Sequence, residues 1–286
     1  MLNISSRGAL WMVLASLLFA CMGVFVKIGS RYFTPAELVF YRAFVGLLVV
    51  WAIIVARGHP LGTPNWRLHL NRSVAGFSAL ALYFVTITRL PLPTAVTLNY
   101  TSSLFIAPLL VLLYRERPPL PLLLALALGF AGVVLLLRPT LAHDQLIDGL
   151  VGLASGFLAA IAMINVKSLG QSGEPEWRVV FYFSLFSTFA SGAWMLLHRF
   201  SPVDWAGAGI LLGMGGSATL AQLALTRAYA TGATLVVASL AYSTVVFSTL
   251  AGWLLWQHVP PLSAWLGMLL VMLAGVLATL LTARRK

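Results

Sequence analysis

Long apolar stretches separated by short polar segments run along the whole chain. An α-helix needs about 20 apolar residues to cross the roughly 30 Å hydrocarbon core of a bilayer, and each stretch comes close to that length. The stretches are continuous, whereas the strands of a membrane barrel alternate between apolar and polar positions over about 10 residues. The pattern therefore predicts ten transmembrane helices, at residues 8–29, 35–56, 70–88, 94–114, 120–138, 148–168, 177–198, 205–226, 233–256 and 262–282.

Composition excludes a water-soluble protein. Of the 286 residues, 60% are hydrophobic and 9% are charged, and the mean hydropathy is +0.95. Soluble domains carry about 25% charged residues, so this chain cannot cover a surface exposed to water. The first apolar stretch, from Gly8 to Val26, is longer than the core of a secretory signal, and no small-x-small cleavage pattern follows it. We therefore expect an all-α polytopic membrane protein in direct contact with the lipid bilayer.

Positive charge is divided unevenly between the two faces that ten helices would create. Both termini lie on one face, which collects twelve of the eighteen Lys and Arg residues, Arg72 among them. The other face collects five, and Arg42 falls inside the second stretch. Because Lys and Arg accumulate on the cytoplasmic side, we expect a bacterial inner-membrane protein with both termini in the cytoplasm. This bias also explains the net charge of +11 without nucleic acid as a partner, since no basic run is interleaved with exposed aromatic residues.

The second half of the chain repeats features of the first. The segment from Tyr100 to Pro119 aligns with residues 242–261 at one constant offset, and Lys27 aligns with Lys167 at a slightly different one. The halves, at residues 8–139 and 148–283, hold five predicted helices each. An odd number of crossings turns the second half upside down relative to the first. Inverted repeats are typical of transporters, whose substrate site lies near the membrane midplane between the two copies.

Short motifs in the first half resemble those of a known transporter superfamily. Pro108 is followed eight positions later by Glu116, and Gly129 and Gly132 lie in the next apolar stretch. Together with the repeat, these residues resemble the drug/metabolite transporter superfamily, in its ten-helix branch of two inverted EamA-type repeats. The second copy lacks both the proline and the glutamate at the corresponding positions. Within this superfamily the chain is most similar to bacterial aromatic amino acid exporters, which implies alternating-access export of amino acids or similar small neutral metabolites.

Polar side chains inside the predicted helices are the candidates for the substrate site, because unsatisfied polar atoms are costly in hydrocarbon. A hydroxyl can instead bond to its own helix or to a neighbouring one, whereas an amide satisfies itself less easily. Matching positions of the two halves would line one central cavity with aromatic walls. The predicted substrate-binding residues are Tyr83, Asn99, Tyr100, Ser103, Asn165, Gln222, Ser239 and Tyr242.

Charged groups are scarce inside the predicted helices. None of the seven acidic residues lies at the centre of a span, where proton-driven carriers commonly place a carboxylate. We therefore expect facilitated transport through a neutral cavity. Arg42 either pairs with Glu37 or reaches the membrane surface, or else it binds a carboxylate of the substrate. Glu116, which lies between two arginines, is expected to form an ion pair at the membrane boundary.

Catalytic and cofactor motifs are missing from the sequence. It contains no glycine-rich phosphate loop ending in Lys-Ser or Lys-Thr, no His-Glu-x-x-His and no Gly-x-Ser-x-Gly. We therefore expect no enzyme activity, no cofactor and no metal, and a small-molecule substrate as the main partner. The alternatives left open are a carrier of another class, such as a drug or nucleotide-sugar carrier, and a membrane enzyme or lipid scramblase. The pattern indicates no particular oligomeric state.

Overall fold

Helices form all the regular secondary structure in the described part of the computed structural model, which covers residues 4–90, 95, 98–115, 119–137, 146–196, 200–256 and 261–283. In the first half they are α1 (Ile4–Gly29), α2 (Pro35–Arg57), α3 (Trp66–Arg89), α5 (Ser102–Tyr114) and α6 (Leu120–Leu137). In the second half they are α7 (Leu146–Gln171), α8 (Glu176–Met195), α9 (Trp205–Thr231), α10 (Thr234–Ala241), α11 (Ser243–Trp256) and α12 (Leu262–Ala283). Every predicted span contains helix.

The helices have the length and surface that a bilayer requires. The stretches long and apolar enough to cross it are Arg7–Gly29, Pro35–Arg57, Leu146–Gln171, Trp205–Thr231 and Thr234–Leu255, and shorter apolar helical stretches lie at Leu98–Leu113, Leu120–Leu135 and Leu262–Ala274. Large apolar side chains point outward, such as Leu112 and Phe189, which are 76% and 72% exposed. Such a surface is unfavourable in water and suits lipid tails. The predicted class, an all-α polytopic membrane protein, is confirmed.

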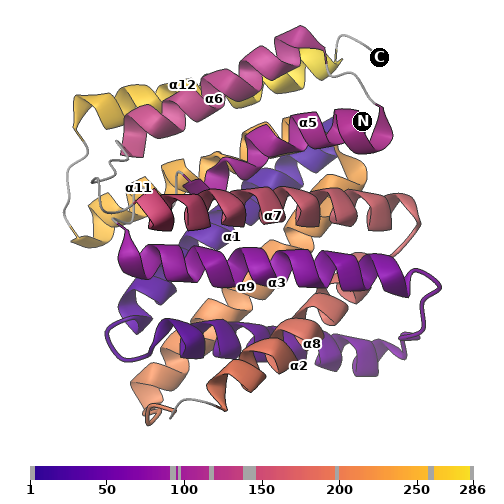
Figure 1. Ribbon diagram of the computed structural model, residues 1–286, viewed down its shortest axis with the longest axis vertical. Coiled ribbons are helices and arrows are strands. Elements are labelled where there is room, and N and C mark those ends of the chain that lie inside the picture. Colours follow the sequence, from indigo (N-terminus) through magenta and orange to yellow (C-terminus); the bar gives the residue numbers. More distant parts are fainter. Residues whose placement is uncertain are drawn as a thin grey trace.

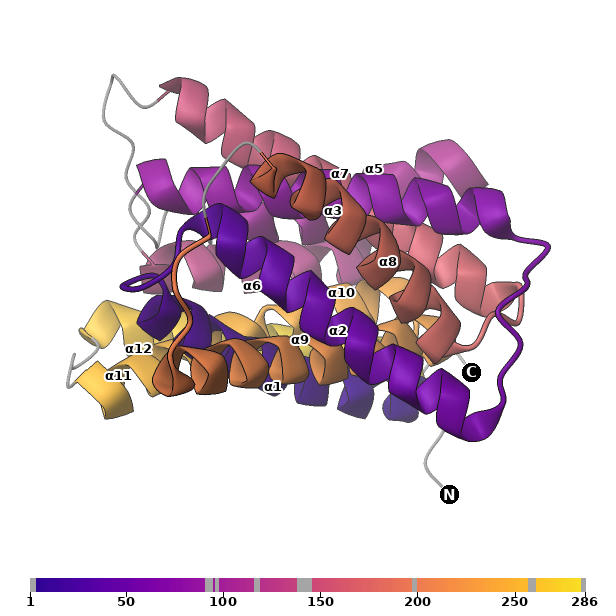
Figure 2. The ribbon, with the colours of Figure 1, turned by 90° about the horizontal axis from the view of Figure 1, so that it is seen from below.

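Helices of one half pair with helices of the other. α1 packs along α9, α3 along α7, α2 along α8 and α6 along α12. In Figure 1 the α6–α12 pair lies at one side of the molecule and α3 runs beside α7, while Figure 2 brings α2 and α8 to the front. Figure 1 also shows that α1 begins and α12 ends at the same end of the bundle. We call it the terminal end, and the opposite one the far end.

Two predicted spans are broken near their middle, at closely corresponding points of the two halves. One break lies at Thr101, between helical residues 98–100 and α5, and the other at Tyr242, between α10 and α11. The Thr101 hydroxyl donates to the carbonyl oxygen of Leu98 over 2.5 Å, and the Tyr242 N–H donates to that of Ser239 over 3.3 Å. These local bonds satisfy backbone groups that a break would otherwise leave free in lipid. In inverted-repeat transporters such broken helices lie at the substrate site.

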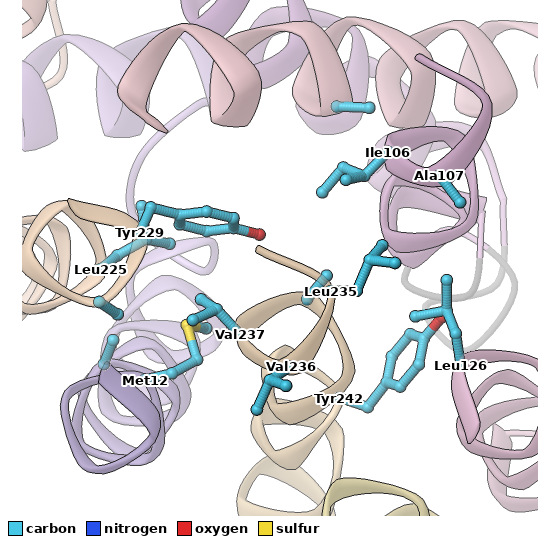
Figure 3. Close-up of a cluster of buried hydrophobic side chains, with 14 of the residues drawn as sticks. Met12, Ile106, Ala107, Leu126, Leu225, Tyr229, Leu235, Val236, Val237 and Tyr242 are labelled. Carbon is cyan, nitrogen blue, oxygen red and sulfur yellow. The ribbon is translucent and has the colours of Figure 1, made fainter. Parts of the chain in front are cut away.

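A large cluster of buried apolar side chains surrounds α10 and holds the second break in place (Figure 3). Met12 of α1 and Tyr229 of α9 meet α10 from one side, and Tyr242 points toward Leu126 of α6 on the other. Gly129 permits this packing, because a Cβ atom there would lie 2.7 Å from the ring of Tyr242. The small residue in α6 therefore serves close helix packing.

Candidate functional site

A cavity of about 590 Å³ lies between the two halves, and every described helix except α6 and α12 contributes to its wall. This volume is typical of sites for small organic molecules. Much of the lining is apolar, with polar groups in a minority. The aromatic side chains in the wall are Phe19, Tyr83, Phe84, Tyr100, Phe183 and Tyr229.

Most of the predicted substrate-binding residues lie in this wall, namely Tyr83, Asn99, Tyr100, Ser103 and Gln222. The Asn99 amide donates to the Ser155 hydroxyl of α7 over 2.8 Å. The Ser103 hydroxyl donates to the carbonyl oxygen of Ala238 over 3.0 Å. Gln222 is 6% exposed, and its Nε2 has no hydrogen-bond partner in the described structure. The amide of Gln222 therefore has unused hydrogen-bonding capacity.

The other three predicted residues lie outside the cavity lining. Asn165 is partly buried in α7, and Ser239 is fully buried in α10. Tyr242 is also fully buried, with its ring 6.2 Å from that of Tyr100 and 6.5 Å from that of Phe130. The two tyrosines that align in the repeat thus have different positions. Tyr100 forms part of the wall, and Tyr242 supports it from behind.

Two arginines in the wall contradict the expected neutral cavity. Arg42 of α2 and Arg72 of α3 are only 7% and 2% exposed, and both line the cavity. Arg72 was counted among the charges of the terminal face, because the third span was expected to begin at residue 70. The helix begins at Trp66, so Arg72 lies in its second turn and inside the bundle. A third span predicted to start at residue 66 would have placed Arg72 inside the bundle and made it a candidate.

Both guanidinium groups lie near one aromatic ring of α8. The Cζ atom of Arg72 is 3.7 Å from the ring centroid of Phe183, and that of Arg42 is 5.9 Å from the same centroid. Gly76 makes room for the first contact, because a Cβ atom there would lie 2.3 Å from Nη1 of Arg72. Within the described residues, neither arginine has a carboxylate within 4.0 Å. The stacking orients these cations and leaves their charge unneutralised.

Pairing with Glu37, one of the alternatives for Arg42, is not found among the ion pairs of the described residues. The Glu37 carboxylate accepts the backbone N–H of Thr34 over 2.7 Å, and the Thr34 hydroxyl oxygen accepts the N–H of Glu37 over 3.4 Å, which together form a capping box at the start of α2. The Thr34 hydroxyl also donates to the Glu37 carboxylate over 2.8 Å. This carboxylate also accepts the N–H of Ser201 over 2.5 Å and its hydroxyl over 3.2 Å. The carboxylate is thus used to join the loop before α2 to the loop before α9. Glu116 lies outside the described residues.

Close backbone contacts shut the cavity toward the terminal end. A Cβ atom on Gly8 would lie 2.4 Å from the Cα of Gly232, which follows α9. A Cβ atom on Gly170, in the last turn of α7, would lie 2.6 Å from the Cβ of Ala230. Only residues without side chains, or with a methyl group, allow backbones to approach so closely. α1, α7 and α9 therefore meet at this end with no room for a solute between them.

A polar network at the terminal end joins the loop before α3 to the connection between α7 and α8. Glu174 accepts hydrogen bonds from Asn65 Nδ2 and Arg178 Nη1, both over 2.9 Å, and from the Thr63 hydroxyl, while His69 Nε2 lies 3.4 Å away. Burial raises the pKa of Glu174, but these hydrogen bonds outweigh it and lower the pKa to about 2. The carboxylate therefore stays charged at neutral pH and binds the loop firmly.

At the far end the cavity reaches Lys27 and Ser30, two exposed residues at the end of α1. The helix packing also differs between the two halves, in a way that agrees with a closed terminal end and an open far end. α7 contacts α9, whereas α1 and α3, their counterparts in the first half, make no comparable contact within the described ranges. The repeat alignment that pairs Lys27 with Lys167 also pairs Ser30 with Gly170. Of these two equivalent positions, Gly170 is therefore closely packed at the terminal end, whereas Ser30 is exposed at the far end.

Comparisons with known proteins point to one family. Residues 6–138 match the EamA-like transporter family. The chain is 30% identical over 275 residues to the pseudopaline exporter CntI of Pseudomonas aeruginosa, with 96% of each chain covered. It is 27% identical over 282 residues to a riboflavin transporter of Vibrio cholerae, with 96% of this chain and 93% of the relative covered. A crystal structure at 21% identity shares the fold, with a TM-score of 0.85 over 99% of both chains. The chain belongs to the EamA-like transporter family.

Proposed function

We propose that this transporter exports amino acids, or metabolites built from them, across the bacterial inner membrane by alternating access. Its two inverted repeats are residues 8–139 and 148–283, and both termini lie in the cytoplasm. The observation that carries the proposal is the cavity of about 590 Å³ between the halves, shut at the terminal end and reaching exposed residues at the far end. With cytoplasmic termini, this is the outward-facing state.

The cavity wall supports an amino-acid type of solute. Tyr83 and Tyr100 offer aromatic faces on which an apolar or aromatic side chain can stack. Asn99, Ser103 and Gln222 offer hydrogen bonds from both halves to the polar end of such a solute. Relatives named for pseudopaline export and riboflavin transport support a small organic solute as the substrate. An aromatic amino acid is the first choice, because the wall combines both kinds of contact.

The transport mechanism we propose is facilitative. No Asp or Glu is found in the lining of the cavity within the described structure. A carrier driven by protons needs a group that takes up and releases a proton as the cavity changes sides, and carboxylates usually serve this purpose. Export would then follow the concentration gradient of the solute.

Uptake by reconstituted protein tests the proposal. Proteoliposomes are given radiolabelled phenylalanine, tryptophan or leucine, with and without an imposed pH gradient. We expect saturable uptake that does not depend on the gradient and falls at least several-fold in Tyr100→Ala, because the variant loses a stacking face worth about 1 kcal/mol. Phe189→Ala is the matched control, since this aromatic side chain is 72% exposed on the outer surface. Folded protein that takes up none of these amino acids would exclude them as substrates.

A further inference from the structure

We propose that Arg42 and Arg72 form an anion-binding subsite in the cavity wall, and that it takes the carboxylate groups of the transported solute. This inference rests on the proposed transport function and narrows it to solutes that carry at least one carboxylate. Among amino acids and metabolites built from them, those with a second carboxylate are expected to bind more tightly than those with one, because the subsite offers two guanidinium groups from two different helices.

The first argument is burial without a partner. Arg42 is 7% exposed and Arg72 is 2% exposed. Nε of both side chains and Nη1 of Arg72 have no hydrogen-bond partner in the described structure. A guanidinium stays protonated in proteins, so neither residue can escape the cost of burial by losing its charge. Buried cations in proteins are normally paired with an anion. The described residues offer these arginines no carboxylate within 4.0 Å, so an anion would reach them from the cavity.

The second argument is orientation. Phe183 stacks on Arg72 and also lies near Arg42, so the two guanidinium groups are held close to one ring. Stacking uses the flat face of a guanidinium and leaves its N–H edge free for a bidentate bond to a carboxylate. Gly76 allows Arg72 to lie flat against its own helix. The subsite is therefore preorganised, and binding of a solute does not require these side chains to become ordered.

The third argument is the balance of charge around the cavity. The Cζ atoms of Arg42 and Arg72 lie 5.9 and 3.7 Å from the same ring centroid, so the two like charges repel each other and an anion between them relieves that repulsion. The described lining contains no carboxylate to offset these two arginines. A cleft lined by one sign of charge concentrates ions of the opposite sign.

Carboxylate fits the subsite better than phosphate. Arginine binds both carboxylate and phosphate, but many phosphate sites add backbone N–H groups at a helix N-terminus. Here the donors are two separate guanidinium edges beside a phenyl ring, which suits planar carboxylates on an organic framework. A solute such as an aromatic amino acid would place its carboxylate at the arginines and its ring near Tyr83 or Tyr100.

Ligand-induced thermal stabilisation of the purified full-length protein tests the subsite. The probes are phenylsuccinate with two carboxylates, phenylalanine with one, phenylalanine amide with none, and inorganic phosphate. We expect stabilisation to follow the number of carboxylates. Arg42→Gln and Arg72→Gln should each weaken phenylsuccinate binding about tenfold or more. Arg67→Gln is the matched control, because Arg67 lies on the same helix as Arg72 and is exposed.

Stability without ligand separates a binding role from a structural one. If the arginines bind solute, both Gln variants should unfold no more readily than the unmodified protein when no probe is present. Loss of stability in the unliganded variants, with unchanged relative binding of the probes, would overturn the proposal. Stabilisation by phosphate and by no carboxylate would overturn the ligand class. Carboxylate binding lost in the variants, in a protein that transports no amino acid, would leave the subsite intact and refute only the proposed transport function.

Discussion

Glu174 lies in the short connection between α7 and α8, and its carboxylate is surrounded by donors from the loop before α3. Arg178, one turn further along, donates both to Glu174 and to the carbonyl oxygen of Pro60 over 2.9 Å. Tyr182 donates to the carbonyl oxygen of Leu61, also over 2.9 Å. The loop between α2 and α3 of the first half is therefore fixed by side chains of the second half, and Glu174 is the central acceptor.

Replacing Glu174 with Gln should destabilise the protein by about 2 kcal/mol at pH 7, because charge-assisted hydrogen bonds become neutral ones. The pKa of Glu174 is lowered from 4.5 to about 2 in the folded protein. A lowered pKa stabilises the fold above the unfolded value, and this contribution is lost as the pH falls toward the folded value. Thermal unfolding in detergent should thus show a difference between the two proteins at pH 7 that shrinks between pH 4.5 and 2.

Glu176→Gln provides the comparison for this variant. Glu176 lies 3.6 Å from Arg227, and both side chains are substantially exposed. Exposed ion pairs contribute little, so this variant should unfold close to the unmodified protein at every pH. Equal losses in Glu174→Gln and Glu176→Gln would show that the loop is not held by Glu174.

At the scale of helices, the break at Thr101 depends on α7, a helix of the second half. A Cβ atom on Gly156 of α7 would lie 2.4 Å from the Thr101 hydroxyl oxygen and 2.7 Å from the carbonyl oxygen of Leu98. The second contact is with backbone, which cannot move aside as a flexible side chain does. α7 therefore sets the position of the residues just before the break, and two of these, Asn99 and Tyr100, line the cavity.

Gly156→Ala should consequently weaken solute binding without unfolding the protein. Overpacking of this kind costs about 1–3 kcal/mol, and we expect it to appear as a several-fold rise in the KM of uptake. Gly216→Ala is the control, because a Cβ atom at Gly216 would meet nothing within 4 Å. If both variants give the same KM, the position of the break does not control the site.

The sequence predicts the helices well and the broken spans poorly, for a physical reason. The bilayer imposes a length on each apolar stretch, so the span positions can be read locally. A break depends on contacts such as the one with Gly156, which the local sequence does not contain. The two breaks also differ by one position in the repeat alignment, at Thr101 and at Tyr242. This shift turns Tyr100 toward the cavity and Tyr242 toward the core, although the alignment makes them equivalent.

Candidate residues were predictable where the residue type alone is unusual in lipid, as with the amides of Asn99 and Gln222. Arg72 was not, because its burial depends on the stacking partner Phe183 and on the space left at Gly76. Both are features of packing between helices. A charged residue near a span end has the same local sequence signature whether it faces water or a cavity.

For the whole molecule, the contact of α7 with α9 at the terminal end has to open if the transporter works by alternating access. We predict that cross-linking Gly170→Cys to Ala230→Cys stops transport, and that reduction restores it. A Cβ atom added at Gly170 would lie 2.6 Å from the Cβ of Ala230, so a small outward shift suffices to reach the usual Cβ–Cβ distance of a disulfide, about 3.8 Å. The experiment uses a Cys21→Ser background, which removes the one native cysteine.

Each single variant, Gly170→Cys and Ala230→Cys, is the control for the double variant. Overpacking at position 170 is expected to slow transport, but each single variant should transport equally under oxidising and reducing conditions. Reactivity of Ser30→Cys toward a membrane-impermeant thiol reagent reports on the far end of the same protein. We expect this introduced thiol to stay reactive in the cross-linked double variant, because in alternating access the far end is open while the terminal end is closed. Normal transport by fully cross-linked protein would contradict alternating access through this contact.

The pairing of helices across the halves also has a consequence for synthesis. α2 and α3 enter the membrane before α8 exists, so Arg42 and Arg72 have no Phe183 to lie against while the first half waits in the bilayer. α6 likewise waits for α12, the last described helix to be made. Helices that can each reside in lipid may be inserted one by one and associate later. Assembly of the described bundle is therefore completed only after α12 has been inserted, and a chain that stops before α8 leaves two arginines in the membrane without Phe183.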